Sequence, residues 1–584
     1  MRRWLLAGGL ALTALAAHGA RGADDGEPPR AEPLIAESVS TSRWVFLGPD
    51  GTLLYARDHW GNRVPDYSYA GYRRGGVRLP VVPVRKVVEP DGDGEDDTAR
   101  LQAAIDELSR LPRGEDGFRG SLLLKAGTYD IKGSLKIQAS GVVLRGEGQT
   151  ADEGTVLRAT FQSEKKAYWT RQGWNHKFVI IGKKIDRRED RDSRREITTD
   201  YLPINSRTFE VESADGYAVG DKVLVRRRQN QRWCTTIMGH PLFKDAPDGE
   251  GKIVHDWGKR TAKPTTREAV CATITAIDGN TVTIDRPIYN VIAKAYGGGY
   301  LARYAESDVV KQVGLENLRL ESVFEPDETG RDPQTHSPCA VSVLGGRDLW
   351  FRDVTCLYFL GTGFMVRSDR TTIQDCRVLM ADPKYYEGLG YVARYGFNVA
   401  GAEVLVQRCY ANYMRHSFNT GYGSSGPRVY LDCLSEGDLG GPGPHFGWVV
   451  GDLFDNVRVA GAELQNSTRG GTQWRGANST FWNCGAVAIV VMQPPPAVPP
   501  VAYNWAIGCY ALPGDPSGHR EFYRGKGVPL VGEGPRMGNG MFESWGERVW
   551  PRSLFEAQLA DRLGPEAVRN IRERVDWRKV KARR

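Results

Sequence analysis

The sequence lacks several features that would mark other classes of protein. After the first 17 residues no apolar stretch approaches the length of a membrane span, and there is no Cys-x-x-Cys pair to indicate a cysteine-based metal site. Charge of one sign is also scarce: removing residues 1–22 takes away three arginines and no acid, so the net charge falls from +7 to +4. So small an excess argues against nucleic acid and is compatible with an acidic glycan as partner.

The amino terminus has the pattern of an export signal. Two arginines precede the uncharged apolar run 4–17, and Ala20-Arg21-Gly22 forms a small-x-small cleavage site. The run is short for a membrane span, and no cysteine lies near the cleavage site to indicate a lipoprotein. The sequence therefore predicts a signal peptide over residues 1–22, a secreted or periplasmic location, and no membrane span after cleavage.

Cysteines mark a repeat in the second half of the chain. Short strand-like runs end at five of the nine cysteines and at two valines: Val354, Cys376, Cys409, Cys433, Val457, Cys484 and Cys509. These anchors are 22, 33, 24, 24, 27 and 25 residues apart, and such a β-rich repeat is typical of a solenoid. In a parallel β-helix the anchors would stack in an inward ladder, with the Asp, Arg or Asn before them pointing outward. We therefore expect buried thiols rather than disulfides or metal ligands.

A helix and a β-rich insertion are predicted before the main repeat. Thr98 can cap the helix, and the acidic run 93–97 would lie by its positive end, with calcium binding as the alternative to capping. The apolar face of the helix comprises Leu101, Ile105, Leu108 and Leu111. Residues 208–227 and 272–288 are each predicted to form a β-hairpin, the second turning at Asp278-Gly279-Asn280.

Two short helices are predicted near the carboxyl terminus. Ser553 and Glu556 form a capping box, and Gly564-Pro565 separates the helices. The predicted segments are an N-terminal extension (23–88), a capping helix with the first coils (89–160), an inserted β-rich subdomain (161–305), the main β-helix (306–515) and a C-terminal segment with short helices (516–584). The fold class is thus all-β, a parallel β-helix with these additions.

The region around the predicted helix resembles the start of the pectate lyase superfamily, the pectin-lyase-like β-helix proteins. The resemblance is carried by GDGEDDTARLQAAID (92–106), LLLKAGTYDI (122–131) and SGVVLRGEG (140–148). It implies a right-handed β-helix whose open N-terminal end is covered by the helix, and a carbohydrate as substrate. It leaves the reaction open, because the fold includes lyases, hydrolases, epimerases and tailspike enzymes.

The sequence departs from two well-known branches of this superfamily. The NTD, GHG and RIK motifs of polygalacturonases are missing, and the Asp cluster and Arg pattern of calcium-dependent pectate lyases cannot be placed. Pectin is therefore not implied as the substrate, and Ca²⁺ is a possible cofactor only. No metal ligand can be named from the sequence.

Residues 382–476 hold the richest set of candidate site residues. His416 and His445 lie there beside aromatic and basic residues, and Arg469 follows His445 by 24 residues, the length of one coil. His445 and Arg469 would then stack on adjacent coils, whereas Arg415 and His416 would occupy a different edge of the same surface. Asp332 and His336 form a weaker candidate pair.

This set suits β-elimination on a uronate. Arg415, Arg469 or Arg475 would neutralise the substrate carboxylate, and His416 or His445 would remove the C5 proton. Tyr386 or Tyr395 would protonate the leaving group, Trp448 and Trp474 would stack on sugar rings, and Lys384 would lie in a loop over the groove. Hydrolysis would need a carboxylate pair, and six acids are available without a distinguishing spacing: Asp382, Glu387, Asp432, Glu436, Asp438 and Asp452.

The sequence therefore predicts a secreted polysaccharide-degrading enzyme, with a lyase favoured. A glycoside hydrolase on the same scaffold and a carbohydrate-binding surface protein without catalysis are the alternatives. A polysaccharide is the expected partner in each case.

Overall fold

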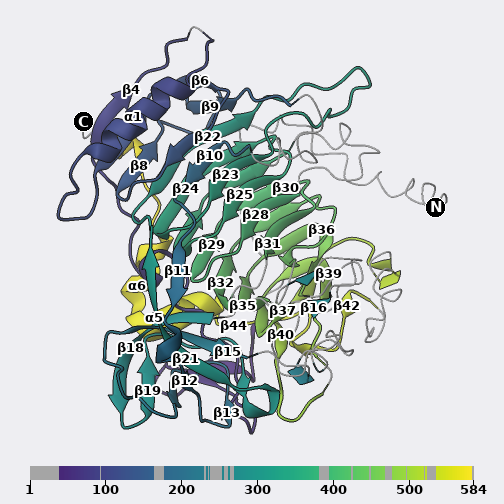
Figure 1. The fold of residues 1–584 in the computed structure, drawn as a ribbon. Helices are drawn as coiled ribbons and strands as arrows, with labels where there is room; N and C mark the ends of the chain where they lie inside the picture. The colour runs from purple at the N-terminus through teal and green to yellow at the C-terminus, as the bar shows by residue number, and fades with distance from the viewer. Residues whose placement is uncertain are drawn as a thin grey trace.

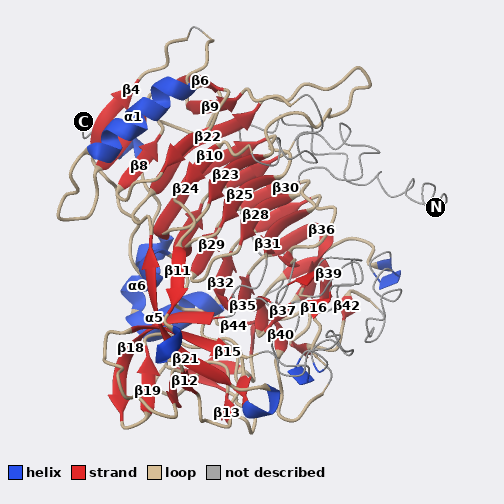
Figure 2. Ribbon diagram, viewed as in Figure 1, coloured by secondary structure: helices blue, strands red, loops and turns tan. Residues whose placement is uncertain are grey.

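The computed structural model shows an elongated stack of parallel strands with a helix over one end (Figure 1). It describes residues 39–581 apart from the following: 93, 164–175, 229–231, 234–235, 237–252, 255–260, 263–268, 381–393, 422–424, 446–448, 467–475, 495, 518–519 and 522–533. Figure 2 shows that strands dominate and that the few helices lie at the periphery. The predicted signal peptide lies outside the described residues. Within them, no helix is both long and apolar enough to cross a membrane.

The stack is a parallel β-helix, as predicted. Its longest sheet is built from one strand per coil: β24 (Arg347–Leu357), β26 (Asp369–Gln374), β29 (Val404–Gln407), β32 (Ser425–Leu431), β35 (Val449–Asp455), β38 (Ser479–Trp482) and β40 (Asn504–Ile507). The residues two positions before the anchors are register partners: Arg352, Gln374, Gln407, Leu431, Asp455, Trp482 and Ile507. The coil lengths of 22 to 33 residues derived from the cysteine ladder are therefore confirmed.

Each coil turns a corner at the residue immediately before its anchor. Six of these corner residues have φ between 51° and 55°: Asp353, Asp375, Arg408, Asp432, Asn456 and Asn483. Asp and Asn are the side chains that tolerate this left-handed conformation best, which explains their recurrence. The anchors themselves lie in the main hydrophobic core, so the predicted inward ladder is confirmed.

The core cysteines carry free thiols. Cys356, Cys376, Cys409, Cys433, Cys484 and Cys509 are buried in the main core, and Cys271 and Cys339 are also unbridged. We therefore expect that alkylation in denaturant without a reductant labels at least these eight cysteines, whereas brief alkylation of the native protein spares the six core thiols. Mass spectrometry of the two samples measures this. Pairs of cysteines that react only after reduction would contradict the free-thiol arrangement.

The helix α1 (Thr98–Arg110) lies over the top of the solenoid in Figure 1. Leu101, Ile105 and Leu108 are buried as predicted, but Leu111 is 40% exposed because it follows the last turn of the helix. The cap also differs from the prediction, since Thr98 is the first helical residue. Its backbone N–H donates to the Asp96 carboxylate at 3.0 Å, so the acidic run caps the helix.

The inserted subdomain is an antiparallel sheet at the bottom of the view in Figure 1. Its strands are β11 (Asp186–Glu189), β21 (Gly299–Ser307), β15 (Lys222–Arg227), β18 (Ala269–Asp278), β19 (Thr281–Ile284) and β14 (Thr208–Glu210), in that order. The second predicted hairpin is confirmed, because β18 and β19 pair directly around Gly279-Asn280. The first is wrong: β14 pairs with β19, and β15 pairs with β18 and β21. The long connection between β14 and β15 allows them to join opposite neighbours.

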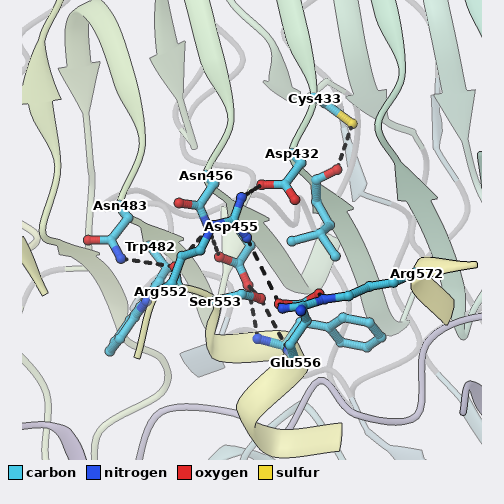
Figure 3. A network of polar contacts seen from close by, with 12 residues as sticks. Asp432, Cys433, Asp455, Asn456, Trp482, Asn483, Arg552, Ser553, Glu556 and Arg572 are labelled. Carbon is cyan, nitrogen blue, oxygen red and sulfur yellow. Dashed lines mark hydrogen bonds and ion pairs between the residues drawn. The ribbon is translucent and has the colours of Figure 1, made fainter. Parts of the chain in front are cut away.

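The C-terminal segment packs along the corners of the coils. It contains β44 (Arg548–Trp550), α5 (Leu554–Leu563), α6 (Pro565–Arg572) and α7 (Trp577–Lys581). Trp577 Nε1 donates to Asp353 at 2.8 Å, and the corner amides of Asn456 and Asn483 donate to the carbonyls of Arg552 and Val549 at 2.8 and 2.9 Å. The corner side chains thus point outward, as predicted, and bind this segment (Figure 3).

The start of α5 is anchored on the solenoid. The Ser553 hydroxyl accepts from Glu556 N at 3.1 Å and donates to Asp455 Oδ2 at 2.7 Å (Figure 3). The capping box is only half formed, because the Glu556 carboxylate pairs with Arg572 instead of returning to Ser553 N. At the other terminus, β1 (Val39–Thr41) pairs in parallel with β44, so the start of the described chain lies beside the strand that precedes α5.

Candidate functional site

A second sheet of the solenoid carries the described candidate residues. It contains β7 (Leu135–Ile137), β10 (Val179–Ile181), β23 (Cys339–Val343), β25 (Thr362–Val366), β28 (Tyr395–Val399), β31 (His416–Thr420) and β34 (Gly443–Pro444). Phe364, Phe397 and Phe418 stack in its core ladder with ring centroids 5.2 and 5.3 Å apart. Tyr395 and His416 are register partners at the first positions of β28 and β31, outside that core cluster.

Three rings meet on this sheet. The centroid of the His416 ring lies 4.4 Å from that of His445 and 6.0 Å from that of Tyr395, and the Tyr395 and His445 centroids are 5.3 Å apart. Tyr395 and His416 are buried, while His445 is partly exposed. The sequence placed the two histidines on different edges. They meet because β34 lies in register beside β31, and His445 N donates to Thr420 O at 2.8 Å.

The orientation of His416 is fixed by a backbone carbonyl. Its Nδ1 lies 2.7 Å from Gly441 O, and a carbonyl oxygen can only accept, so Nδ1 carries the proton of the neutral ring. The lone pair of the neutral imidazole is then on Nε2, the form in which a histidine acts as a base. This arrangement gives the cluster a proton acceptor whose tautomer is set by the fold.

Glycines bring the chain close enough to form this contact. A Cβ on Gly441 would lie 2.3 Å from Glu463 O and 3.0 Å from the Glu463 carboxyl carbon, so the Glu463 side chain packs directly against Gly441. Gly443 has φ 135°, and a Cβ there would lie 1.8 Å from Gln465 O. Any larger residue at either position would displace the turn that presents Gly441 O to His416.

A buried carboxyl group supports the strand that carries His416. The Ser417 hydroxyl donates to Asp438 Oδ1 at 2.5 Å, and the Ser417 backbone N–H faces the other oxygen at 3.4 Å. Asp438 is 6% exposed, and burial raises the pKa of its carboxyl group to about 7. Asp438 was considered only as one of six possible hydrolytic acids. Its structural role depends on a contact between residues 21 positions apart, which no local pattern announces.

The protonation of Asp438 predicts a pH dependence of stability. Because its folded pKa lies above the unfolded value of about 3.9, its favourable contribution is complete below about pH 4 and is lost as the pH rises through about 7. Asp438→Asn, which keeps a neutral side chain of the same shape, should therefore lose less stability than the wild type between pH 4 and 8. Urea unfolding across this range measures the difference. Parallel curves for the two proteins would show that Asp438 does not titrate on unfolding.

The structure describes four of the ten residues predicted for the site. It brings Tyr395, His416 and His445 together, and it places Arg415, which is partly exposed, next to His416 in the chain. The other six lie outside the described residues: Lys384, Tyr386, Trp448, Arg469, Trp474 and Arg475. The assignment of roles to these six stays a prediction.

The four described candidate acids are each held by another residue. Arg428 Nε lies 2.6 Å from Asp452, Arg552 lies 2.6 Å from Asp432, and the Tyr410 hydroxyl donates to Glu436 at 2.7 Å. Asp438 binds Ser417 as described above. Asp382 and Glu387 lie outside the described residues. The four described candidates therefore do not present a carboxylate pair for hydrolysis.

The weaker pair Asp332 and His336 forms a buried structural network. His336 Nδ1 lies 3.0 Å from Ser322 Oγ, and His336 Nε2 lies 3.3 Å from Asp332. The order Ser-His-Asp is that of a hydrolytic triad, but Ser322 is 0% exposed and its hydroxyl accepts from Ser337 N at 3.1 Å. The Ser322 hydroxyl is held between the His336 ring and the Ser337 backbone N–H, so the network stabilises the loop that precedes β23.

The described residues contain no group of three or more His, Cys, Asp or Glu side chains arranged to hold a metal ion. Two acids of the run considered for calcium, Asp96 and Asp97, are engaged in other contacts, and Asp93 lies outside the described residues. Asp96 accepts from Thr98 N and Lys132 N at 3.0 Å each, and Asp97 pairs with Arg100. These contacts fit the capping role.

No protein-family model and no curated protein matches the chain. Among solved structures, the tailspike protein gp49 from Pseudomonas phage LKA1 is 13% identical with a TM-score of 0.36, over 72% of this chain and 58% of the tailspike. The Gp54 tailspike of Acinetobacter baumannii bacteriophage AP22, in complex with a capsular saccharide, is 10% identical with a TM-score of 0.35, over 72% and 56%. The polygalacturonase from Erwinia carotovora ssp. carotovora is 11% identical with a TM-score of 0.33, over 75% and 95%. The matched region thus spans little more than half of either tailspike.

Proposed function

We propose that the protein is an exported enzyme that binds a uronate-containing polysaccharide on the β28–β31–β34 face and cleaves it by β-elimination. The observation that carries the proposal is the His416–Gly441 contact. It fixes Nε2 as the proton acceptor of a ring in contact with His445 and Tyr395. A base, a second imidazole and a phenol in one cluster are the groups that proton abstraction and leaving-group protonation require.

In the proposed reaction, His416 Nε2 removes the C5 proton of a uronate residue. The electron pair left at C5 forms the C4–C5 double bond, and the C4–O bond to the next sugar breaks. Tyr395 or His445 supplies the proton that the departing oxygen takes up. Arg415, which precedes His416 in the chain, is assigned to the substrate carboxylate. Neutralising that carboxylate makes the C5 proton more acidic.

Hydrolysis is the second candidate. It is less well supported because the four described candidate acids are bound to Arg428, Arg552, Tyr410 and Ser417. A binding protein without catalysis would need the same surface but no fixed base.

The test is an absorbance assay for unsaturated uronates on a panel of uronate-containing glycans, with and without calcium. The proposal expects rising ultraviolet absorbance together with new reducing ends. New reducing ends without absorbance would establish hydrolysis instead. Saturable glycan binding without either product would leave a binding protein, and would refute the assignment of His416 as a base.

A further inference from the structure

A cleft lies between the inserted subdomain and the solenoid, at the end of the strands that carry the ring cluster. Its volume is about 520 Å³. One wall is formed by β11, β15 and β18, and the other by the segments that follow β23, β25 and β28. Ala400 and Gly401 line it directly after β28, so it opens about 16 Å along that strand from Tyr395. Cavities of this size hold ligands of one to a few ring units.

The lining of the cleft is strongly basic. Its charged members are Lys184, Arg187, Arg226, Arg286, Arg367 and a single acid, Asp369. Lys184 and Arg367 are exposed and have no acidic partner within 4.0 Å among the described residues. The remaining arginines pair with acids that are themselves shared between several cations. The cleft therefore presents unbalanced positive charge to its interior.

Glu306, which lies behind the cleft, shows the same imbalance. Its carboxylate contacts Arg347 at 2.7 Å, Arg187 at 3.4 Å and Lys222 at 3.5 Å. Burial alone would raise its pKa, but the hydrogen bond and charge of Arg347, with the charges of Arg187 and Lys222, hold the pKa of Glu306 at about 2. One carboxylate is thus shared by three cations, so its single negative charge cannot compensate their combined positive charge.

Two buried residues that line the cleft carry donors without a hydrogen-bond partner among the described residues. Ser425 is 6% exposed, and its hydroxyl has no hydrogen-bond partner among the described residues. Arg286 is 3% exposed; its other nitrogens bind Gly426 O at 2.6 Å and Glu403 at 3.2 Å, but its Nε–H is unused. Leaving such groups buried and unsatisfied is costly, and both residues line the basic cleft, which favours a bound acceptor there.

We propose that this cleft is a second ligand site, which binds an oxyanion group, a carboxylate or a sulfate, carried by a saccharide. Arginine forks and a serine hydroxyl match the oxygens of such groups, and the unbalanced cations supply the attraction. This proposal rests on the proposed function in one respect only, namely that the molecule bearing the oxyanion is a saccharide. Binding here requires no chemistry at His416.

The test is calorimetric titration of the intact protein with four probes: a hexuronate trisaccharide, a neutral trisaccharide, the same trisaccharide bearing sulfate esters, and sodium sulfate. The double variant Lys184→Gln/Arg367→Gln should bind the anionic trisaccharides at least about tenfold more weakly than the wild type. Lys183→Gln, which neutralises an adjacent exposed lysine outside the cleft, should bind normally. Preference for one anionic trisaccharide identifies the oxyanion.

Two further readouts locate the site. Cys271 lines the cleft and is partly exposed, so bound ligand should slow its alkylation in the native protein. Ser425→Ala should weaken binding without lowering the melting temperature, because its hydroxyl has no hydrogen-bond partner among the described residues that the substitution would leave unpaired.

Several outcomes would overturn the proposal. Equal affinity for the neutral and the anionic trisaccharides would show that the site does not recognise negative charge. Binding of sodium sulfate without binding of any trisaccharide would exclude a saccharide carrier. Unchanged affinity in Lys184→Gln/Arg367→Gln would place binding elsewhere. A lower melting temperature of ligand-free Ser425→Ala, with unchanged affinity, would indicate that the hydroxyl holds only water. Because a His416→Asn background should bind normally, failure of this site is distinguishable from failure of the proposed reaction.

Discussion

His416→Asn is expected to cleave uronate-containing glycans about 10²–10⁴-fold more slowly than the wild type, the range that a positioned general base contributes. The asparagine amide can still donate to Gly441 O, which His416 Nδ1 reaches at 2.7 Å, so the turn should keep its shape. What the variant lacks is a basic atom at the position of Nε2. The initial rate of ultraviolet absorbance at saturating glycan measures this loss.

Two controls separate loss of the base from loss of structure. His59→Asn changes an exposed histidine of the N-terminal extension and should leave the rate unchanged. The melting temperature of His416→Asn should stay near that of the wild type, because the retained donor satisfies Gly441 O. A fully active, folded His416→Asn protein would refute the assignment and would turn attention to His445, whose ring lies 4.4 Å away.

Glu316→Gln is expected to lower the free energy of unfolding by about 3–5 kcal/mol, the cost of removing one partner from a buried ion pair. Glu316 lies on β22 (Gly314–Ser322) between Arg145 on β8 (Val142–Arg145) and Arg352 on β24. Both guanidinium groups contact the carboxylate at 2.6 Å, and the Trp350 indole donates to it at 2.9 Å. Glutamine keeps the shape but leaves two buried arginines without a counter-charge. Denaturant unfolding measures the difference.

A control on the same strand tests the explanation. Glu321 pairs with Arg319 at 2.8 Å but is 26% exposed, so Glu321→Gln should cost at most about 1 kcal/mol. The two variants should also differ in pH response. Burial alone would raise the pKa of Glu316, but the charges of Arg352 and Arg145 hold it below its ordinary value. Its contribution is therefore present above about pH 4.5 and is lost on acidification. A similar loss of stability in both variants would show that burial of the triad is not the cause.

The coil register could be predicted because short local sequence patterns determine it. Six of the seven anchors follow an Asp, Arg or Asn in a left-handed corner, and Cys509 follows Gly508 in the same conformation. The distance between anchors is the length of a coil, whatever the length of the intervening loop. The pairing of β14 could not be predicted in the same way. Its partner β19 lies about 70 residues later, and the choice between β15 and β19 depends on the order of strands in the finished sheet.

The site was predictable only in part, for a related reason. Residue types pointed to His416, His445 and Tyr395, but their contact requires the register of three separate strands. Asp438 and Glu463 were not recognised as supports, because they contact Ser417 and Gly441 across coils. The basic cleft joins β11, β15 and β18 to residues more than 70 positions later in the chain, and no motif spans that distance.

The C-terminal segment changes how the solenoid can come apart. Coils that touch only their neighbours can open one at a time from a free end. Here the residues from Val549 onward cross the corners at Asp353, Asp432, Asn456 and Asn483, so distant coils are fastened to one strap. Fraying of any of these coils then breaks contacts to the strap as well, which favours all-or-none unfolding. Since the strap follows the coils in the sequence, it can fasten them only after all of them have been synthesised.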